Sequence, residues 1–466
     1  MNKFKFFLIF QFLIIMILIF ISSENANFFY EIVKDFDILY NFENIDNFIV
    51  YYRFYNLVKQ RYFIYGYDTK NDKNYGFSPP NEFITTRPFF NENKNAFAYG
   101  ALYQGNDFVW YKDFKNNSAY KILYSISGKL SLLSLDRSHK NIIVGFDYLA
   151  PQQFLYVSGV KEFYTYPMAS YPNIVEVNFT FDEKFIYVIY KYENLYNCDI
   201  LPLSENPYKS SSYKPPVKKI FSNVDEVLLS NSSVILTREK EQYFFYNMKD
   251  YSKNKIENLV VLKDINNDKN CIVLIDGGLY DKNLEKIEFI TGNENKNINE
   301  KTIINYLKLG KKIFYSNNYL LLDDDQNSFY IFIYNEERKI FKFLSSITLK
   351  SKNFNLISDG KILLINQIEG NLIFLVYNSY LSSNSISILL YNKDDAKIET
   401  LYSDYIYSFI KGLNCYNGFA FLVKKTYTKG IYQELYYYSF NGNILKKISG
   451  WENVMDNELE LIKRKD

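Results

Sequence analysis

Histidine is almost absent from this chain of 466 residues, which contains only His139. Zinc sites with two or three histidine ligands therefore cannot form from this chain alone, and neither can a HExxH metallohydrolase site. A Ser-His-Asp or Cys-His site would have to use His139, which lies in a predicted solvated turn. The sequence also lacks GxSxG, P-loop and GxGxxG motifs. These absences predict no cofactor and no identifiable catalytic residue.

Cysteine is scarce as well, because the chain has only Cys198, Cys271 and Cys415, far apart in sequence. Three cysteines allow at most one disulfide bond, whereas small exported domains usually depend on several. We therefore expect three small buried side chains and no disulfide framework.

Net charge is nearly absent, since 54 Lys and Arg oppose 52 Asp and Glu. This balance gives no electrostatic reason to expect a nucleic-acid partner. A hydrophobic content of 48% and a charged content of 23% are typical of a globular protein. Residues 27–466 are too many for one conventional core, but they suit a propeller or two to three ordinary domains.

Proline is confined to the first half of the chain, and four of the ten prolines lie in a Ser- and Lys-rich stretch at about 202–218. Hairpin-like units continue on both sides of this stretch. We therefore predict a long surface loop between repeats and not an interdomain linker, so that residues 27–466 form one domain.

Aromatic residues, by contrast, are abundant, with 46 Tyr and 41 Phe, which are strong strand formers. A hairpin signature built on tyrosine recurs between residues 65 and 448. Each copy begins with a run of aromatic and aliphatic residues that ends at a Tyr. A few Asn, Asp or Lys residues follow, and after them comes a short apolar strand that completes the predicted hairpin. The copies begin at Trp110, Tyr246, Leu279, Tyr334, Tyr391 and Tyr438.

Polar turns that enter apolar strands are the second recurring element, as at Asp182-Glu183-Lys184 and Asn417-Gly418. Asn-Gly and Asp-Gly are expected to supply the positive φ angles of tight hairpins. Together the two elements divide the chain into units of about 46 residues, the size of propeller blades. The units are 30–80, 83–127, 129–170, 174–219, 223–260, 261–291, 303–347, 352–401 and 405–448.

The unit at 261–291 is too short for a full blade, so we predict eight blades, with seven as the alternative count. Glu458–Ile462 is predicted to be a last strand that pairs with the first blade. The one predicted helix is short and spans about Glu300–Leu307.

This arrangement resembles β-propeller repeat proteins of the WD-repeat and PQQ-like kind. The resemblance implies an all-β fold of four-stranded antiparallel sheets. The Gly-His and Trp-Asp landmarks of WD repeats are missing, because Trp110 is followed by Tyr111. The tryptophan and glycine pattern of PQQ-like blades is missing too. The resemblance therefore implies a fold and transfers no active site.

The N-terminus carries Lys3 and Lys5, followed by an apolar run over residues 6–21. This length fits a signal peptide and is short for a membrane span. Glu24 makes cleavage after Ala26 unfavourable, so residues 1–26 are predicted to be a signal peptide or an uncleaved signal anchor. Either way we expect the body to be exported, as a periplasmic, cell-surface or secreted protein that touches a membrane only through residues 6–21.

One stretch suggests a metal site. Asp323, Asp325 and Asn327 have the oxygen spacing of a calcium loop. Ser328 stands where the loop needs glycine, and Tyr334 stands where it needs a bidentate glutamate. A solvated hairpin turn is the alternative interpretation.

The leading functional hypothesis is an exported, monomeric, non-enzymatic propeller that binds a protein or a glycan. The alternative is a propeller hydrolase or lyase that uses acidic residues at the central channel. A third possibility is an outer-membrane β-barrel, which alternating aromatic strands and an export signal would also fit. The charged end Lys463–Asp466 opposes that third possibility.

Overall fold

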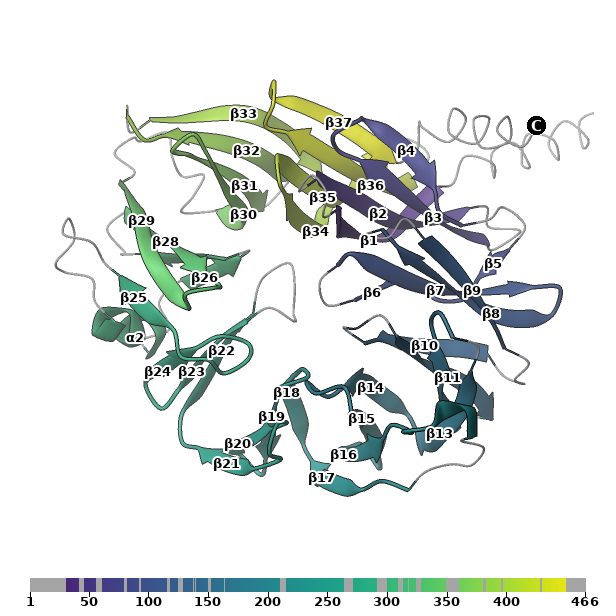
Figure 1. Cartoon of the computed structure of the whole chain (residues 1–466). Helices are drawn as coiled ribbons and strands as arrows, with labels where there is room; N and C mark the ends of the chain where they lie inside the picture. Colours follow the sequence, from purple (N-terminus) through teal and green to yellow (C-terminus); the bar gives the residue numbers. More distant parts are fainter. Residues whose placement is uncertain are drawn as a thin grey trace, which may run out of the picture. The chain divides into compact units, whose positions relative to one another are not determined.

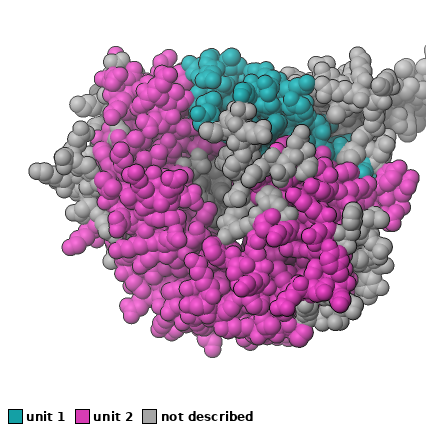
Figure 2. Space-filling view, in the orientation of Figure 1, with its two compact units in different colours: residues 1–84, 406–411, 415–466 teal, residues 85–405, 412–414 magenta. Residues whose placement is uncertain are grey.

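The computed structural model describes residues 31–449 with short gaps, and most of this region is β-strand. The gaps are 42–45, 56–60, 79–81, 92–93, 115–117, 125–128, 137, 139, 150–151, 163, 210–214, 264–270, 291–299, 309–312, 317, 324–327, 349–359, 380–382, 395–396 and 428–429. The chain divides into two compact units (Figure 2). Unit 1 comprises residues 1–84, 406–411 and 415–466, and unit 2 comprises residues 85–405 and 412–414.

The described strands form nine sheets, numbered here in chain order (Figure 1). Sheet 1, in unit 1, contains β1 (Glu31–Asn41), β2 (Asp46–Tyr55), β3 (Arg61–Asp68) and β4 (Lys73–Gly76). Sheet 2 contains β5 (Phe83–Ile84), β6 (Phe89–Phe90), β7 (Ala96–Tyr103), β8 (Asn106–Asp113) and β9 (Ser118–Tyr124). Sheet 9, most of which lies in unit 1, contains β34 (Ser408–Cys415), β35 (Gly418–Tyr427), β36 (Gly430–Ser439) and β37 (Ile444–Ser449).

Unit 2 contains sheets 3 to 8. Sheet 3 has β10 (Lys129–Leu135), β11 (Asn141–Leu149), β12 (Gln152–Gly159) and β13 (Thr165–Pro172), and sheet 4 has β14 (Ile174–Phe179), β15 (Phe185–Tyr192), β16 (Leu195–Pro202) and β17 (Lys218–Val224). Sheet 5 has β18 (Glu226–Ser230), β19 (Val234–Glu239), β20 (Gln242–Asn247) and β21 (Lys253–Ile256), and sheet 6 has β22 (Leu259–Lys263), β23 (Cys271–Ile275) and β24 (Gly278–Tyr280). Sheet 7 has β25 (Glu288–Ile290), β26 (Ile313–Ser316), β27 (Tyr319–Asp323), β28 (Ser328–Asn335) and β29 (Ile340–Thr348), and sheet 8 has β30 (Gly360–Ile368), β31 (Asn371–Ser379), β32 (Asn384–Asn392) and β33 (Lys397–Ile406).

The fold is the predicted all-β propeller, and the nine sheets correspond to the nine predicted units. Eight sheets have four or five strands, in line with the expected eight blades, and sheet 6 has three. The structure explains why the unit at 261–291 is short. Its last strand, β25, pairs in parallel with β29 of sheet 7, so that sheet 6 gives this strand to its neighbour.

Sheets of a propeller bury both faces, and this accounts for the continuously apolar strands. Val177 and Ile186 of sheet 4 pack against Val157 of sheet 3, while Ile189 of sheet 4 packs against Ile235 of sheet 5. Each such fully buried side chain contributes about 1.5–3 kcal/mol of apolar burial. The tyrosine signature is confirmed at the ends of third strands, where Tyr-Asn or Tyr-Ser closes β20, β28, β32 and β36.

The tight turns agree with the prediction only in part. Four two-residue turns join second to third strands, and a fifth joins the first strand of sheet 8 to the second. Both residues of each turn have positive φ, the pattern of a type I′ turn, and one of these turns is of the predicted Asp-Gly kind. These turns are Gln104-Gly105, Glu193-Asn194, Lys240-Glu241, Asp276-Gly277 and Glu369-Gly370. Gly418 is not among the residues with positive φ. It is needed for close packing instead, since a Cβ there would lie 2.2 Å from the Tyr438 carbonyl oxygen.

A β-bulge interrupts the pairing of the first strand with the second in five sheets. The extra residues are Lys34, Ser131, Val175, Leu228 and Leu363. In unit 2, first strands of neighbouring sheets contact one another, as β10 contacts β14. A bulge bends its strand and changes the direction of the side chains on it. The bulges therefore change the shape of the first strands, which meet between neighbouring sheets.

Other predicted elements have mixed outcomes. Helix α2 (Glu300–Lys308) matches the predicted helix. The proline-rich loop, which includes the short 3-10 helix η1 (Pro207–Lys209), joins β16 to β17 within sheet 4 and does not lie between repeats. Residues 6–21 and 458–462 lie outside the described residues. Among the residues that are described, no helix has the length and apolar character needed to cross a membrane.

Candidate functional site

Polar side chains link the first strands of sheets 3, 4 and 5. The hydroxyl of Ser134 on β10 donates to Asn178 Oδ1 on β14 at 3.3 Å. On the same strand β14, Glu176 Oε2 accepts a short hydrogen bond from the hydroxyl of Ser230 on β18. In a propeller the blades surround a central channel, and in this unit the first strands are the ones that meet between sheets.

Glu176 is held from its own sheet as well. Its Oε1 atom lies 3.2 Å from the hydroxyl of Tyr187 on β15, which donates to it. Tyr187 is fully buried and belongs to the apolar cluster between sheets 4 and 5, together with Cys198. Glu176 and Ser230 are only half-buried. The carboxylate therefore lies at the edge of an apolar core, within reach of a small molecule.

The groups that face Glu176 are neutral. Burial, followed by the nearby Glu176 charge, raises the pKa of Tyr187 well above its ordinary value, so this tyrosine stays protonated and donates. Burial, followed by the charges of Asp199 and Glu176, likewise raises the pKa of Cys198 well above its ordinary value. No lysine or arginine forms an ion pair with Glu176 among the described residues.

A hydroxyl in direct contact with a carboxylate can undergo nucleophilic chemistry. The carboxylate accepts the hydroxyl proton as the oxygen attacks, and a third group that orients the carboxylate completes the usual arrangement. In this arrangement Ser230 has the position of the nucleophile and Glu176 that of the proton acceptor. Tyr187 has the position of the group that orients the carboxylate.

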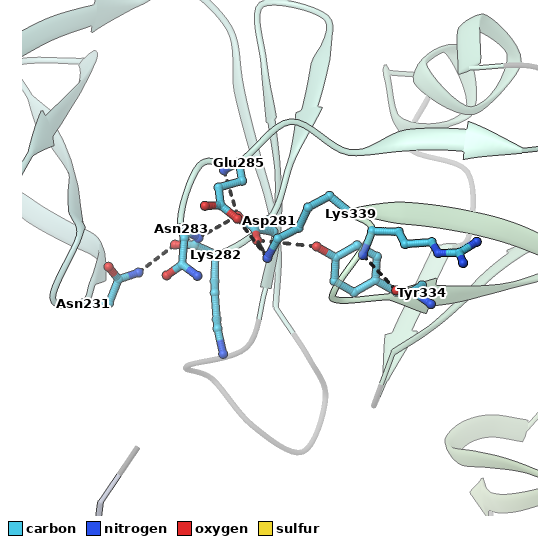
Figure 3. A network of polar contacts seen from close by, with 9 residues as sticks. Asn231, Asp281, Lys282, Asn283, Glu285, Tyr334 and Lys339 are labelled. Carbon is cyan, nitrogen blue, oxygen red and sulfur yellow. Dashed lines mark hydrogen bonds and ion pairs between the residues drawn. The ribbon is translucent and has the colours of Figure 1, made fainter. Parts of the chain in front are cut away.

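A second polar network, around Asp281, has a structural role in joining two sheets (Figure 3). Asp281 Oδ1 accepts from the backbone amides of Asn283 and Glu285 at 2.9 and 2.8 Å. Its Oδ2 atom accepts from Lys339 Nζ at 2.9 Å and from the Tyr334 hydroxyl at 3.4 Å. Both oxygens are thus occupied by protein donors, and the network joins the end of sheet 6 to sheet 7.

The predicted metal ligands lie mostly beyond what the structure describes. Asp323 ends β27, but its side chain, Asp325 and Asn327 are outside the described residues. In the described part of the chain, no group of three or more His, Cys, Asp or Glu side chains is placed to hold a metal ion. The calcium-loop interpretation stays a prediction, and His139 is outside the described residues too.

Sequence reasoning did not identify Glu176 or Ser230. The two residues are 54 positions apart and belong to different sheets, so no local motif joins them. One signal was available, because Glu176 and Asn178 interrupt an otherwise apolar strand. Polar residues inside a buried strand need partners, and those partners are what the structure reveals.

No protein-family model matches this chain, and no curated protein matches it. Similar solved structures include a prolyl endopeptidase (9% identity, TM-score 0.36, covering 79% of this chain and 50% of that chain). The β-propeller domain of the trilobed protease from Pyrococcus furiosus is similar at 12% identity and a TM-score of 0.35, covering 81% of this chain and 99% of that domain. Prolyl oligopeptidase B from Galerina marginata is similar at 10% identity and a TM-score of 0.39, covering 88% of this chain and 55% of that chain. The chain spans about half the length of the first and third of these proteins.

The leading functional hypothesis of a non-enzymatic binding module finds no support in these matches, several of which are peptidases and therefore hydrolases, while another is a dihydro-heme d1 dehydrogenase. At 9–12% identity and TM-scores of 0.35–0.39, the matches assign no activity to this chain. The earlier hypothesis rested on the absence of known catalytic motifs. A hydroxyl and a carboxylate that meet across two sheets leave no motif in the sequence.

Proposed function

We propose that this propeller is a hydrolase of ester or amide bonds, with Ser230 as its nucleophile and Glu176 as its general base. The observation that carries the proposal is the direct hydrogen bond from the Ser230 hydroxyl to the Glu176 carboxylate between two first strands. Both residues are half-buried, so a substrate carbonyl can approach them from the solvent.

The reaction follows from the two groups. Ser230 Oγ attacks the substrate carbonyl carbon as its proton passes to Glu176. The leaving alcohol or amine takes that proton as its bond to carbon breaks, which leaves the acyl group on Ser230. A water molecule then attacks the acyl-serine and gives its proton to Glu176. As the bond between the acyl carbon and Ser230 Oγ breaks, Glu176 returns this proton to Oγ, which releases the acid and restores the serine hydroxyl and the carboxylate.

The test is covalent labelling of the full chain with a fluorophosphonate probe, followed by peptide mass spectrometry. We expect label on Ser230, and hydrolysis of p-nitrophenyl esters that Ser230→Ala abolishes. Glu176→Gln should lower kcat by about 10²–10⁴-fold, the usual contribution of a general base.

Two variants serve as matched controls. Ser131 is an exposed serine on a first strand whose hydroxyl donates to the Gly145 carbonyl at 3.3 Å and contacts no carboxylate. Glu226, on the first strand β18, pairs with Arg238 at 3.0 Å. Ser131→Ala and Glu226→Gln should leave hydrolysis unchanged, and label on Ser131 in place of Ser230 would refute the assignment.

We also propose that the protein is exported, and that residues 6–21 act as the export signal or, if uncleaved, as a membrane anchor. The basic start and the apolar run support this proposal. N-terminal sequencing of the exported protein tests it. A first residue near Asn27 indicates cleavage, an intact Met1 in a salt-resistant membrane pellet indicates an anchor, and recovery of the protein only from the cytoplasm refutes export.

A further inference from the structure

We infer that Tyr187 is the positioning residue of this site, which aims the Glu176 carboxylate at Ser230. The inference rests on the proposed function for its catalytic meaning. The contacts that support it are independent of any activity.

Tyr187 provides one of the two hydrogen bonds that hold the Glu176 carboxylate. Its hydroxyl donates to Glu176 Oε1 at 3.2 Å, which leaves Oε2 to accept from Ser230 on the neighbouring sheet. A neutral tyrosine has one hydroxyl proton, and that proton is directed at Glu176. Asn178, on the same strand as Glu176, accepts at its Oδ1 atom from the Ser134 hydroxyl at 3.3 Å and from the backbone amide of Phe179 at 2.9 Å.

The tyrosine is also rigidly placed. Tyr187 is 0% exposed and packs in the cluster between sheets 4 and 5 with Ile189 and Ile235. A donor fixed by packing holds its partner in one orientation without paying side-chain entropy during the reaction. Glu176, at the core edge, thereby has one oxygen anchored and the other facing the nucleophile.

The experiment compares Tyr187→Phe with the full-length native chain. We expect kcat for ester hydrolysis to fall about tenfold with KM unchanged, because Glu176 loses the donor that orients it. A purely structural role would lower Tm and leave kcat unchanged, and that result would overturn the inference.

Tyr246→Phe is the matched control. Tyr246 lies in the same apolar cluster, and its hydroxyl donates to a different carboxylate, Glu239 Oε1, at 2.6 Å. It should cost similar stability and leave kcat unchanged. An equal fall of kcat in Tyr246→Phe would count against a specific role for Tyr187.

A second measurement does not depend on catalysis. Isotope-edited infrared spectroscopy of carboxylates, with Glu176→Gln as the blank, reports the hydrogen bonding of Glu176 directly. A shifted Glu176 carboxylate band in Tyr187→Phe supports the positioning role even if Ser230 proves unreactive, in which case the proposed function alone fails. An unchanged band overturns the inference whatever the activity.

Discussion

The ammonium nitrogen of Lys339 lies 2.9 Å from the carboxylate of Asp281, although the two residues are 58 positions apart and belong to adjacent sheets. Lys339 stands in the turn between β28 and β29, and Asp281 directly follows β24. The Glu285 carboxylate lies 2.9 Å from the same nitrogen. Because sheet 6 has only three strands, this ion pair and strand β25 add to the apolar packing that joins it to sheet 7.

Replacing Lys339 with Met should lower the free energy of unfolding by about 1–3 kcal/mol, because Asp281 would remain buried without its cation. The estimate is below the full value for a buried pair, since the Lys339 side chain is 26% exposed. Urea unfolding measures the change. Lys342→Met, at an exposed position on the next strand, is the control and should change stability by less than about 0.5 kcal/mol.

The same pair predicts a pH dependence. Burial lowers the pKa of Lys339, but hydrogen bonds and charges from Asp281 and Glu285 outweigh it and raise the pKa above the ordinary 10.5. A raised pKa in the folded state means that the stabilisation is complete below the unfolded value and is lost as the pH rises through the folded value. The stability difference between the native chain and Lys339→Met should therefore shrink above about pH 10.5. A constant difference up to pH 12 would argue against the assignment.

Two neighbouring lysines in sheet 9 provide a matched comparison. Lys447 Nζ lies 2.6 Å from Glu434, whose side chain is 0% exposed, and hydroxyls of Tyr427 and Tyr436 also donate to this carboxylate. Lys446 pairs with Asp72, which is 54% exposed. Lys447→Met should cost about 3 kcal/mol and Lys446→Met less than about 1 kcal/mol, measured by urea unfolding. Equal losses of unfolding free energy in the two variants would show that the burial of Glu434 does not determine the strength of its ion pair.

The cysteines should be inert in the folded protein. All three are free and buried, as the sequence predicted. Burial raises the pKa of Cys271 to about 11 and that of Cys198 well above its ordinary value, so thiolate is scarce at neutral pH. We expect no reaction with Ellman's reagent until urea is added, and no change in Tm with reductant. Rapid labelling of one thiol in the native state would contradict the burial.

Two glycines should respond differently to alanine. At Gly105, with φ +82°, no atom would lie within 4 Å of a new Cβ, so Gly105→Ala should cost only the backbone strain of about 1 kcal/mol. At Gly418 the new Cβ would lie 2.2 Å from the Tyr438 backbone oxygen, which forces β35 and β36 apart. Gly418→Ala should therefore cost more than twice as much, as measured by thermal unfolding. A smaller cost at Gly418 would mean that the two strands relax easily.

The sequence predicted the units well because the second strands of the sheets contain runs that are buried on two faces. The run Ile186-Tyr187-Val188-Ile189 is apolar on both sides, and such runs are visible without any partner. The Tyr-Asn ends of third strands could be found for the same reason. The type I′ turns could be predicted only in part. Asp276-Gly277 is an Asp-Gly pair of the expected kind, whereas Lys240-Glu241 has positive φ at both residues and contains neither glycine nor asparagine.

The candidate site was beyond sequence reasoning for a different reason. Ser230 and Glu176 are brought together by the packing of two sheets and not by spacing along a strand. Tyr187 looked like any other aromatic in a buried strand, because its hydroxyl partner is visible only when β14 and β15 are paired in register. A side-chain pair that forms across two sheets can be predicted only when the strand register of both sheets is known.

Unit 1 is assembled from both ends of the chain, and this has a consequence for synthesis on the ribosome. Sheet 1 and sheet 9 share no strand; β1 contacts β35 and β36, and the Tyr67 and Tyr437 rings lie 5.9 Å apart. The first sheet is translated hundreds of residues before its packing partner, so its apolar face must wait uncovered while unit 2 emerges. Such contacts of high sequence separation are slow to form and leave aggregation-prone surface exposed meanwhile. We therefore expect unit 1 to complete its packing only after the strands of sheet 9 have been translated, and a nascent chain halted before residue 415 to display sheet 1 to chaperones.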